Sequence, residues 1–247
     1  MPSRATDLPV LVCPRVGGSI RVDGDVHKAP WTSVSPVWLL PSHGRARDMG
    51  VAPEVALACL APDGPPLAPV FVFQPTAVRV CRTAAHLHVA FQCLDRDVWG
   101  TFEGRNQPIY TEEAVEAFLA PGPGVGRYFE LETSPRGAFF EARIESPEHH
   151  RRSMVVDTGW VCAGWERAVR VRGTLDRRDD IDHGWSVEWA IPFASLGVAP
   201  PRTGDCWRAN FTRIDQALGG QYSAWSPTGA DPPDFHLPLR FGVLEFA

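Results

Sequence analysis

Paired carboxyl groups are the feature of this sequence whose spacing comes nearest to catalytic chemistry. A glycoside-cleaving site needs two, one to protonate the departing oxygen and one to attack or to activate water. Glu116 could approach either Glu113 or Glu130. The adjacent Glu112 and Glu113 would instead diverge on a strand. Nothing in the surrounding sequence indicates the apolar pocket that would raise the pKa of one carboxyl, so the pattern argues against hydrolysis.

Other catalytic and metal-binding patterns are missing from the sequence. There is no G-x-S-x-G motif, and no glycine-rich phosphate loop precedes a helix. His86 and His88 share a predicted strand face, and His149 and His150 lie in a polar turn, but neither pair has a third ligand or the spacing of a zinc helix. The six cysteines include no C-x-x-C pair, and most lie in apolar runs, which indicates buried free thiols.

An aromatic loop near the end of the sequence is a better candidate for binding. WSPTGADPPDFHLPLRFG, residues 225–242, is too aromatic and too rich in proline for a tail. Its prolines fix φ, which lowers the entropy lost when Phe235 is held in one pose. Trp99 also lies in a loop-like stretch, where packing explains an aromatic less easily. The other tryptophans considered are predicted to fill the core: Trp31, Trp38, Trp185, Trp189, Trp207 and Trp225.

Composition limits the classes of partner. The net charge of -5 and the scattered arginines provide no basic stripe for nucleic acid. No apolar run approaches the roughly 20 residues that a membrane span needs. Pro9 and Pro14 interrupt the opening segment, which therefore lacks the core of a signal peptide and predicts a cytoplasmic protein.

Alternating apolar and polar residues predict an all-β fold, an antiparallel β-sandwich with few short helices. Helical turns are expected only near PWTSV and PFASLG, and residues 41–70 read as a long excursion across one edge. No linker is evident, so residues 1–247 are predicted to form a single domain. The predicted strands are SIRVDG, TAVRVCRTAAHLHVAFQCLD, AVEAFLAP, RYFELETS, AFFEARIE, RAVRVRGTLD, GWSVEWAIPF, DCWRANFTRID and RFGVLEF.

Several segments, taken in order, resemble carbohydrate-binding module family 9. The resemblance runs from about Ser19 to Phe246, and its order and spacing are more specific than any single motif. The sandwich it implies is jelly-roll-like and similar in shape to DOMON domains. The segments are IRVDGDVHKAPW, HLHVAFQCLDRDVWG, YTEEAVEAFLAP with its V-E-x-F strand, GWSVEWAIPFASLG, CWRANFTRID, SAWSP and FHLPLRFGVLEF.

The resemblance implies a non-catalytic protein that holds a mono- or oligosaccharide between two aromatic side chains. Those positions fall on Tyr110 and Phe235, where family members with established binding usually have tryptophan. Polar partners for the sugar hydroxyls would come from Glu116 and from Asn210 or Arg213, which project from opposite faces of one strand, with Asn210 preferred. Further candidates for the floor and edge of the site are Glu130, Glu132, His236 and Trp99.

Two other functions, a bound calcium ion and the cellular location also have to be considered. A glycoside-active enzyme is one alternative, and a haem or electron-transfer sandwich ligated through methionine and histidine, with Met49 or Met154, is the other. No cofactor is certain, but the family often carries structural calcium, for which Asp95, Asp97 and Asp176 to Asp182 supply oxygens. The resemblance also makes an extracytoplasmic location conceivable, because sugar-binding modules commonly work outside the cell.

Overall fold

Two β-sheets pack face to face in the computed structural model, which describes residues 8–43 and 48–247. Strands run antiparallel to their neighbours, except that the first strand pairs in parallel with the last. The all-β sandwich is therefore confirmed. The larger sheet has the order β1 (Val10–Cys13), β14 (Gly242–Phe246), β12 (Cys206–Asp215), β6 (Glu113–Ala120), β7 (Arg127–Thr133), β8 (Phe139–Glu145) and β9 (Val155–Asp157); β13 (Gln221–Ala224) pairs with β12 and with β3 (Leu40–Pro41).

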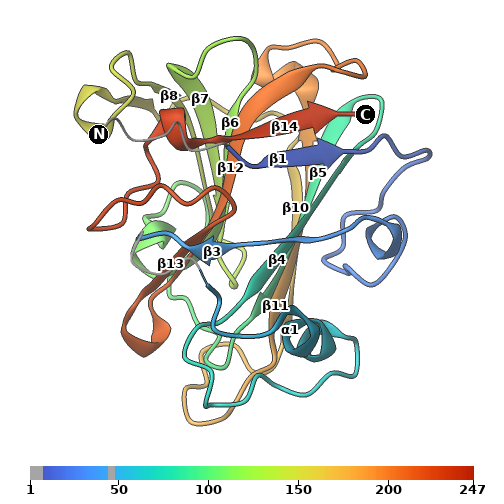
Figure 1. Cartoon of the computed structure of the whole chain (residues 1–247), viewed down its shortest axis with the longest axis vertical. Coiled ribbons are helices and arrows are strands. Elements are labelled where there is room, and N and C mark those ends of the chain that lie inside the picture. The colour runs from blue at the N-terminus through green and yellow to red at the C-terminus, as the bar shows by residue number, and fades with distance from the viewer. Residues whose placement is uncertain (1–7, 44–47) are drawn as a thin grey trace, which may run out of the picture.

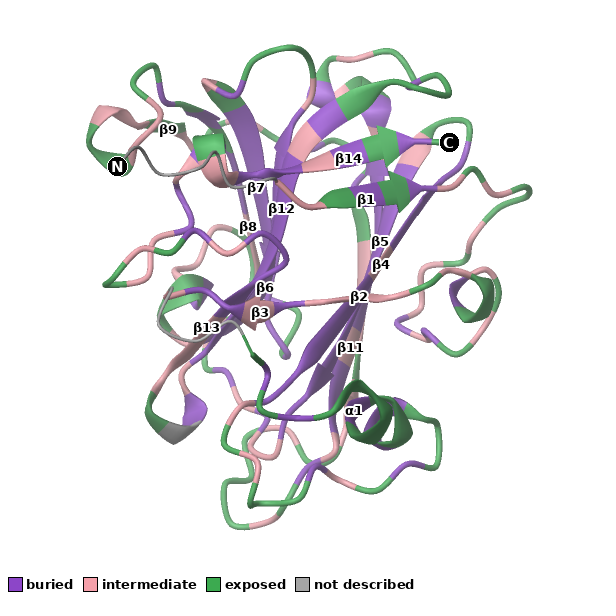
Figure 2. Ribbon diagram, viewed as in Figure 1, coloured by how far each residue is buried: buried purple, intermediate pink, exposed green. Residues whose placement is uncertain are grey.

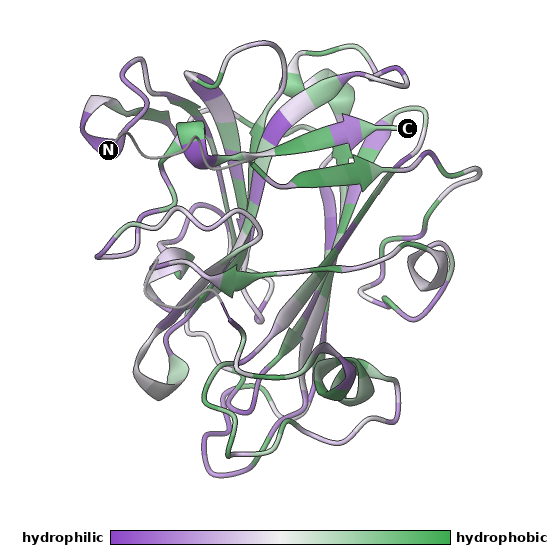
Figure 3. Cartoon of the chain, in the orientation of Figure 1, coloured by the Kyte–Doolittle hydropathy of each residue, from purple (hydrophilic) through white to green (hydrophobic). Residues whose placement is uncertain are grey.

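The smaller sheet completes the sandwich, and the main hydrophobic core lies between the two inner faces. Phe91 and Trp189 from this sheet meet edge to face at 5.0 Å between ring centroids, and Phe91 also contacts Phe211 of the larger sheet. Strands are mostly buried and loops mostly exposed (Figure 2), and hydropathy changes from residue to residue along several strands (Figure 3). The order is β10 (Glu166–Arg172), β11 (Gly184–Pro192), β5 (His86–Leu94), β4 (Thr76–Arg82) and β2 (Val37–Trp38).

Helices are few and short, as predicted, and none of those described has the length and hydrophobicity to cross a bilayer. The excursion 41–70 contains an unpredicted α-helix, α1 (Pro53–Leu60), which begins with proline in its first turn and packs beside Ala77 and Leu94. The expected turns at PWTSV and PFASLG are the 3-10 helices η1 (Trp31–Ser33) and η4 (Phe193–Leu196). The others are η2 (Ile109–Thr111), η3 (Arg151–Ser153), η5 (Ala217–Gly219) and η6 (Pro238–Arg240).

The strand predicted at SIRVDG is wrong. This segment is irregular because its backbone donates hydrogen bonds to the buried carboxylate of Glu188 and does not pair with a neighbouring strand. Glu188 accepts from the backbone N–H of Gly24 at 2.7 Å and from the Trp31 indole N–H at 2.6 Å. The prediction of unpaired thiols is confirmed, with five cysteines buried and Cys206 exposed.

Candidate functional site

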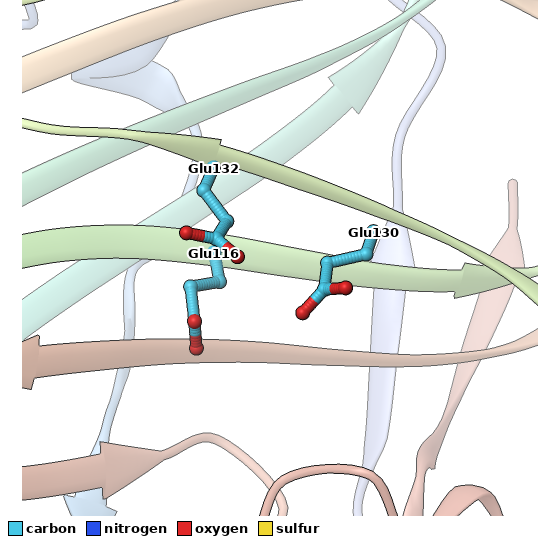
Figure 4. A group of neighbouring side chains, drawn as sticks. All are labelled: Glu116, Glu130 and Glu132. Carbon is cyan, nitrogen blue, oxygen red and sulfur yellow. The ribbon is translucent and has the colours of Figure 1, made fainter. Parts of the chain in front are cut away.

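Three glutamates project from neighbouring strands to the same side of the larger sheet (Figure 4). Glu116 on β6 lies directly opposite Glu132 on β7, and Glu130 lies two residues before Glu132 on the same face. This face points away from the core that the two sheets share, because the alternate residues Val115 and Leu131 fill that core. We call Glu116, Glu130 and Glu132 the carboxyl trio. Their oxygens come within 4.8 Å of one another, so the three carboxylates could surround one small cation.

A second apolar cluster covers this outer face and leaves a cavity of about 420 Å³ above the trio. Phe118 of β6, Tyr128 of β7 and Phe235 from the closing loop pack together there. The cavity brings together six predicted site residues: Tyr110, Glu116, Glu130, Glu132, Phe235 and His236. Two larger hollows, of about 620 and 900 Å³, lie elsewhere, but their acidic residues Glu145, Asp48 and Asp231 are exposed.

The two predicted aromatic walls differ in how they are held. Tyr110 sits in η2, just before β6, and its side chain is 45% exposed, with one edge contact to Phe140 at 6.1 Å between ring centroids. Phe235 is only 6% exposed and packs against Phe118 and Tyr222. Tyr110 can therefore be altered with little loss of packing, whereas Phe235 also belongs to a core.

Side chains of β12 hold the closing loop, residues 225–241, in place. The Asn210 amide donates to the carbonyl of Ser226 at 3.0 Å and accepts from the N–H of Ser226 at 2.9 Å. Arg208 donates to the carbonyl of Phe241 at 2.8 Å. Trp225 lies so close to Gly242 that a Cβ there would approach the indole ring to 2.5 Å. Asn210 thus shares the outer face with Glu116, as predicted, but its side chain anchors the loop and does not line the cavity.

Burial raises the pKa of every carboxyl in the trio. It raises the pKa of Glu116 to about 7, although a hydrogen bond from the Thr212 hydroxyl acts in the opposite direction. Burial and the charge of Glu116 raise the pKa of Glu130 to about 8, and burial with both neighbouring charges holds the pKa of Glu132 well above its ordinary range. No apolar pocket is expected around these carboxyl groups from the sequence. That expectation is wrong, because the apolar cluster over the outer face buries them and so raises their pKa values.

His236 lies beside the trio but does not neutralise it. Its Nε2 is 3.4 Å from an oxygen of Glu130, and its Nδ1 is 2.9 Å from the hydroxyl of Tyr128. Burial and the nearby charge of Arg151 lower the pKa of His236 to about 3. The imidazole is therefore neutral at pH 7, and its contact with Glu130 is not an ion pair.

Arg213 was a predicted site residue, but it does not line the cavity. It lies on the inner face of β12, 1% exposed, because the strand turns every second residue inward. Its guanidinium forms an ion pair with Asp95 at 2.7 Å and another with Asp215 at 3.2 Å. Glu113, considered above as a partner of Glu116, belongs to this inner group, 4.0 Å from Arg213.

Trp99 also lies outside the cavity. The guanidinium of Arg178 stacks over its ring, 4.7 Å from the ring centroid. Several of the carboxylates considered for calcium contact protein donors. Asp176 pairs with Arg136 at 2.5 Å, Arg178 pairs with Asp97, and Asp182 accepts hydrogen bonds from the backbone N–H groups of Thr174 and Val98.

Sequence reasoning missed several residues that line the cavity. Arg151 of η3 pairs with Asp234 at 3.0 Å, which places the segment after β8 over the outer face. Met154 lines the same cavity and accepts a hydrogen bond from Tyr128, whereas Met49 lines a different hollow. The sequence AVEAFLA in β6 could have revealed that other segments cover the outer face of the sheet. Ala114, Phe118 and Ala120 make that face apolar as well.

Comparisons with known proteins agree with this architecture. A solved candidate carbohydrate-binding protein from Bacteroides uniformis matches over 98% of this chain and 100% of its own, with 17% identity and a TM-score of 0.72. Two structures of a family 9 module from Caldicellulosiruptor kristjanssonii, one with cellotriose and one with glucose, match at 14% identity and a TM-score of 0.54. They cover 96% and 97% of this chain, and 93% and 96% of theirs. At these identities the likeness shows the fold alone.

The sequence itself carries the assignment further than the structural likeness does. No curated protein matches the chain. The family model described as carbohydrate-binding family 9, a family of non-catalytic binding modules, matches residues 68–246, which is more than half of the sequence. The chain therefore belongs to carbohydrate-binding family 9.

Proposed function

We propose that this protein binds a saccharide non-covalently, without catalysis, in the cavity between Tyr110 and Phe235. The observation that carries the proposal is that two aromatic side chains from distant segments line one cavity with three buried carboxyl groups. A sugar ring presents C–H groups that pack on aromatic faces, and its hydroxyls need polar partners once they leave water. Glucose and cellotriose in the related modules make neutral sugars the first ligands to try.

Membership of a family of non-catalytic modules favours binding over hydrolysis. The carboxyl spacing argues only against an inverting glycosidase, which needs roughly 6.5–9.5 Å between its two carboxyl groups to admit water. The oxygens of the trio lie within 4.8 Å of one another, which is nearer to the roughly 5–5.5 Å of a retaining glycosidase. Because the family is non-catalytic, incubation with cellobiose should release no glucose. A steady release that Glu130→Gln abolishes would support the enzyme alternative instead, and an absorbance spectrum of the purified protein tests the haem alternative.

Calorimetric titration of Tyr110→Ala with glucose, cellobiose and xylobiose tests the binding proposal. A sugar covering one ring face removes about half of the roughly 150 Å² that an aromatic buries, which contributes on the order of 2 kcal/mol. We therefore expect binding about 10- to 30-fold weaker than in the parent. The melting temperature should hardly change, because Tyr110 is 45% exposed.

Two further variants make the result specific. Trp99→Ala removes a half-buried aromatic outside the cavity and should leave the affinity unchanged. Phe235→Leu keeps apolar volume while removing the flat face, and should weaken binding. Equal affinity in the parent, Tyr110→Ala and Phe235→Leu would mean that the sugar binds elsewhere or that the rings only fill space.

A further inference from the structure

The floor of the cavity carries more acidic groups than its protein surroundings satisfy. The Thr212 hydroxyl donates to Glu116, and the neutral His236 lies near Glu130. Neither oxygen of Glu132 accepts a hydrogen bond from a donor of the described residues, although the side chain is 1% exposed and points toward Glu116 (Figure 4). The carboxyl of Glu130 can share a hydrogen bond with Glu132 only while one of the two is protonated.

No lysine or arginine of residues 8–43 and 48–247 forms an ion pair with the trio, and the charge of Arg151 acts on Glu116 and Glu130 only from a distance. Arg151 is the guanidinium that lines the cavity, and it is bound to Asp234 at 3.0 Å with its side chain 56% exposed at the rim. Lysine and arginine nitrogens of the described residues stay more than 4.0 Å from all three carboxyl groups. An unpaired buried carboxylate is costly, so a bound positive charge would stabilise this site strongly.

The ligand must match both the charge of the floor and the apolar walls. A neutral sugar offers single hydroxyl donors and brings no charge that would favour the ionised carboxylates over their protonated forms. A bare metal ion would satisfy the carboxylates but would fill only a small part of a cavity of about 420 Å³ lined by Tyr110, Phe118 and Phe235. An ammonium group carries three N–H donors and one positive charge, and a pyranose ring attached to it can lie against the aromatic side chains.

We propose that the carboxyl trio is a cation subsite that receives the ammonium group of an amino sugar. This inference rests on the proposed function and names the class of saccharide that the same cavity prefers. Glu132 is the central acceptor, because it has no donor of its own, and Glu116 and Glu130 complete the set of acceptors.

Proton uptake and release provide a signature of this preference. In the empty site, burial and mutual repulsion keep the carboxyl pKa values high, at about 7 for Glu116 and about 8 for Glu130, so the trio holds protons at pH 7. An entering ammonium group favours the charged carboxylates and expels those protons to buffer. A neutral sugar makes no such demand, and His236, with its low pKa, adds no proton exchange near pH 7.

The test is calorimetry at pH 7 with glucosamine, glucose and N-acetylglucosamine, in two buffers that differ in ionisation enthalpy. Glucosamine should bind at least about tenfold more tightly than glucose, since charge-assisted hydrogen bonds are the stronger class. Its apparent enthalpy should differ between buffers, which reports proton release. N-acetylglucosamine keeps the ring but loses the charge, so it should show neither the gain in affinity nor the buffer dependence.

Matched variants locate the effect. Glu132→Gln keeps the size of the side chain, and should reduce the ratio of glucosamine affinity to glucose affinity to about one. Glu245→Gln removes one exposed negative charge from β14, outside the cavity, and should retain the preference. Melting curves establish that each variant is folded, and Glu130→Gln serves as the second variant should Glu132→Gln fail to fold.

The outcomes separate this inference from the proposed function. Equal affinity for glucosamine and glucose would overturn the cation subsite and leave saccharide binding intact. Failure of all three sugars to bind would overturn both. Tight binding of Ca²⁺ or Mn²⁺ alone, lost in Glu132→Gln and accompanied by no glucosamine preference, would reassign the trio to a metal ion and overturn the amino-sugar assignment.

Discussion

Arg213→Met should lower the free energy of unfolding by about 3–5 kcal/mol, because it leaves buried carboxylates without their counter-charge. The guanidinium of Arg213 is 1% exposed and pairs with Asp95 and Asp215. It also donates to the backbone carbonyl of Leu94 at 2.8 Å, a bond that methionine cannot replace. For a chain of this size the loss corresponds to a fall of about 6–20 °C in melting temperature.

Denaturant titration and calorimetry at pH 7 measure this loss, and Arg143→Met is its control. Arg143 pairs with Asp157 at 2.8 Å, but its side chain is 44% exposed, so its removal should cost less than about 1 kcal/mol. The deficit of Arg213→Met should shrink as the pH falls and the orphaned carboxylates become protonated. A variant within 1 kcal/mol of the parent at pH 7 would contradict the role assigned to this inner ion cluster.

Glu130→Gln should stabilise the protein at pH 8. Burial raises the pKa of Glu130 from an ordinary 4.5 to about 8 in the folded protein. The folded state therefore binds more protons than the unfolded state between these values, and the free energy of unfolding falls as the pH rises through this window. The rise corresponds to on the order of 5 kcal/mol at about 1.36 kcal/mol per pKa unit. We expect the variant to melt about 10–20 °C above the parent at pH 8.

The interval from pH 6.5 to 8 separates the carboxyl trio, in which Glu116 and Glu132 contribute with the same sign as Glu130, from His236. Burial lowers the pKa of His236 from 6.5 to about 3, so its contribution has the opposite sign: it grows as the pH rises from about 3 and is complete near 6.5. Glu145→Gln on the exposed end of β8 is the control and should follow the parent at every pH. A parent melting temperature that stays level or rises between pH 6.5 and 8 would count against a buried, protonated trio.

Alternation of residue types predicted the long strands and the faces on which their side chains lie. Glu130 and Glu132 share a face, and Asn210 and Arg213 point to opposite faces, because neighbouring residues in a regular strand point to opposite sides. Strands of two to four residues, such as β1 and β13, are too short to show alternation. They form because distant partners hold them, as β14 holds β1.

The burial of the trio lay beyond what local pattern could predict. A glutamate on an outer sheet face ordinarily meets water, and only the cover formed by Phe235, Arg151 and their neighbours changes that. This cover depends on contacts across long stretches of sequence, which periodicity does not report. That residues 1–247 form a single domain likewise remains a prediction, since the family match begins at residue 68.

The cavity is assembled late along the chain, because Tyr128 and the His236 that contacts it are 108 residues apart. Closing so long a connection is slow and comes after local structure has formed. Residues as far as Phe235 must leave the ribosome before both walls can meet. On the function proposed above, an immobilised sugar would retain only molecules in which this cavity has formed, so retention on such a resin would measure the yield of correctly folded protein in a preparation.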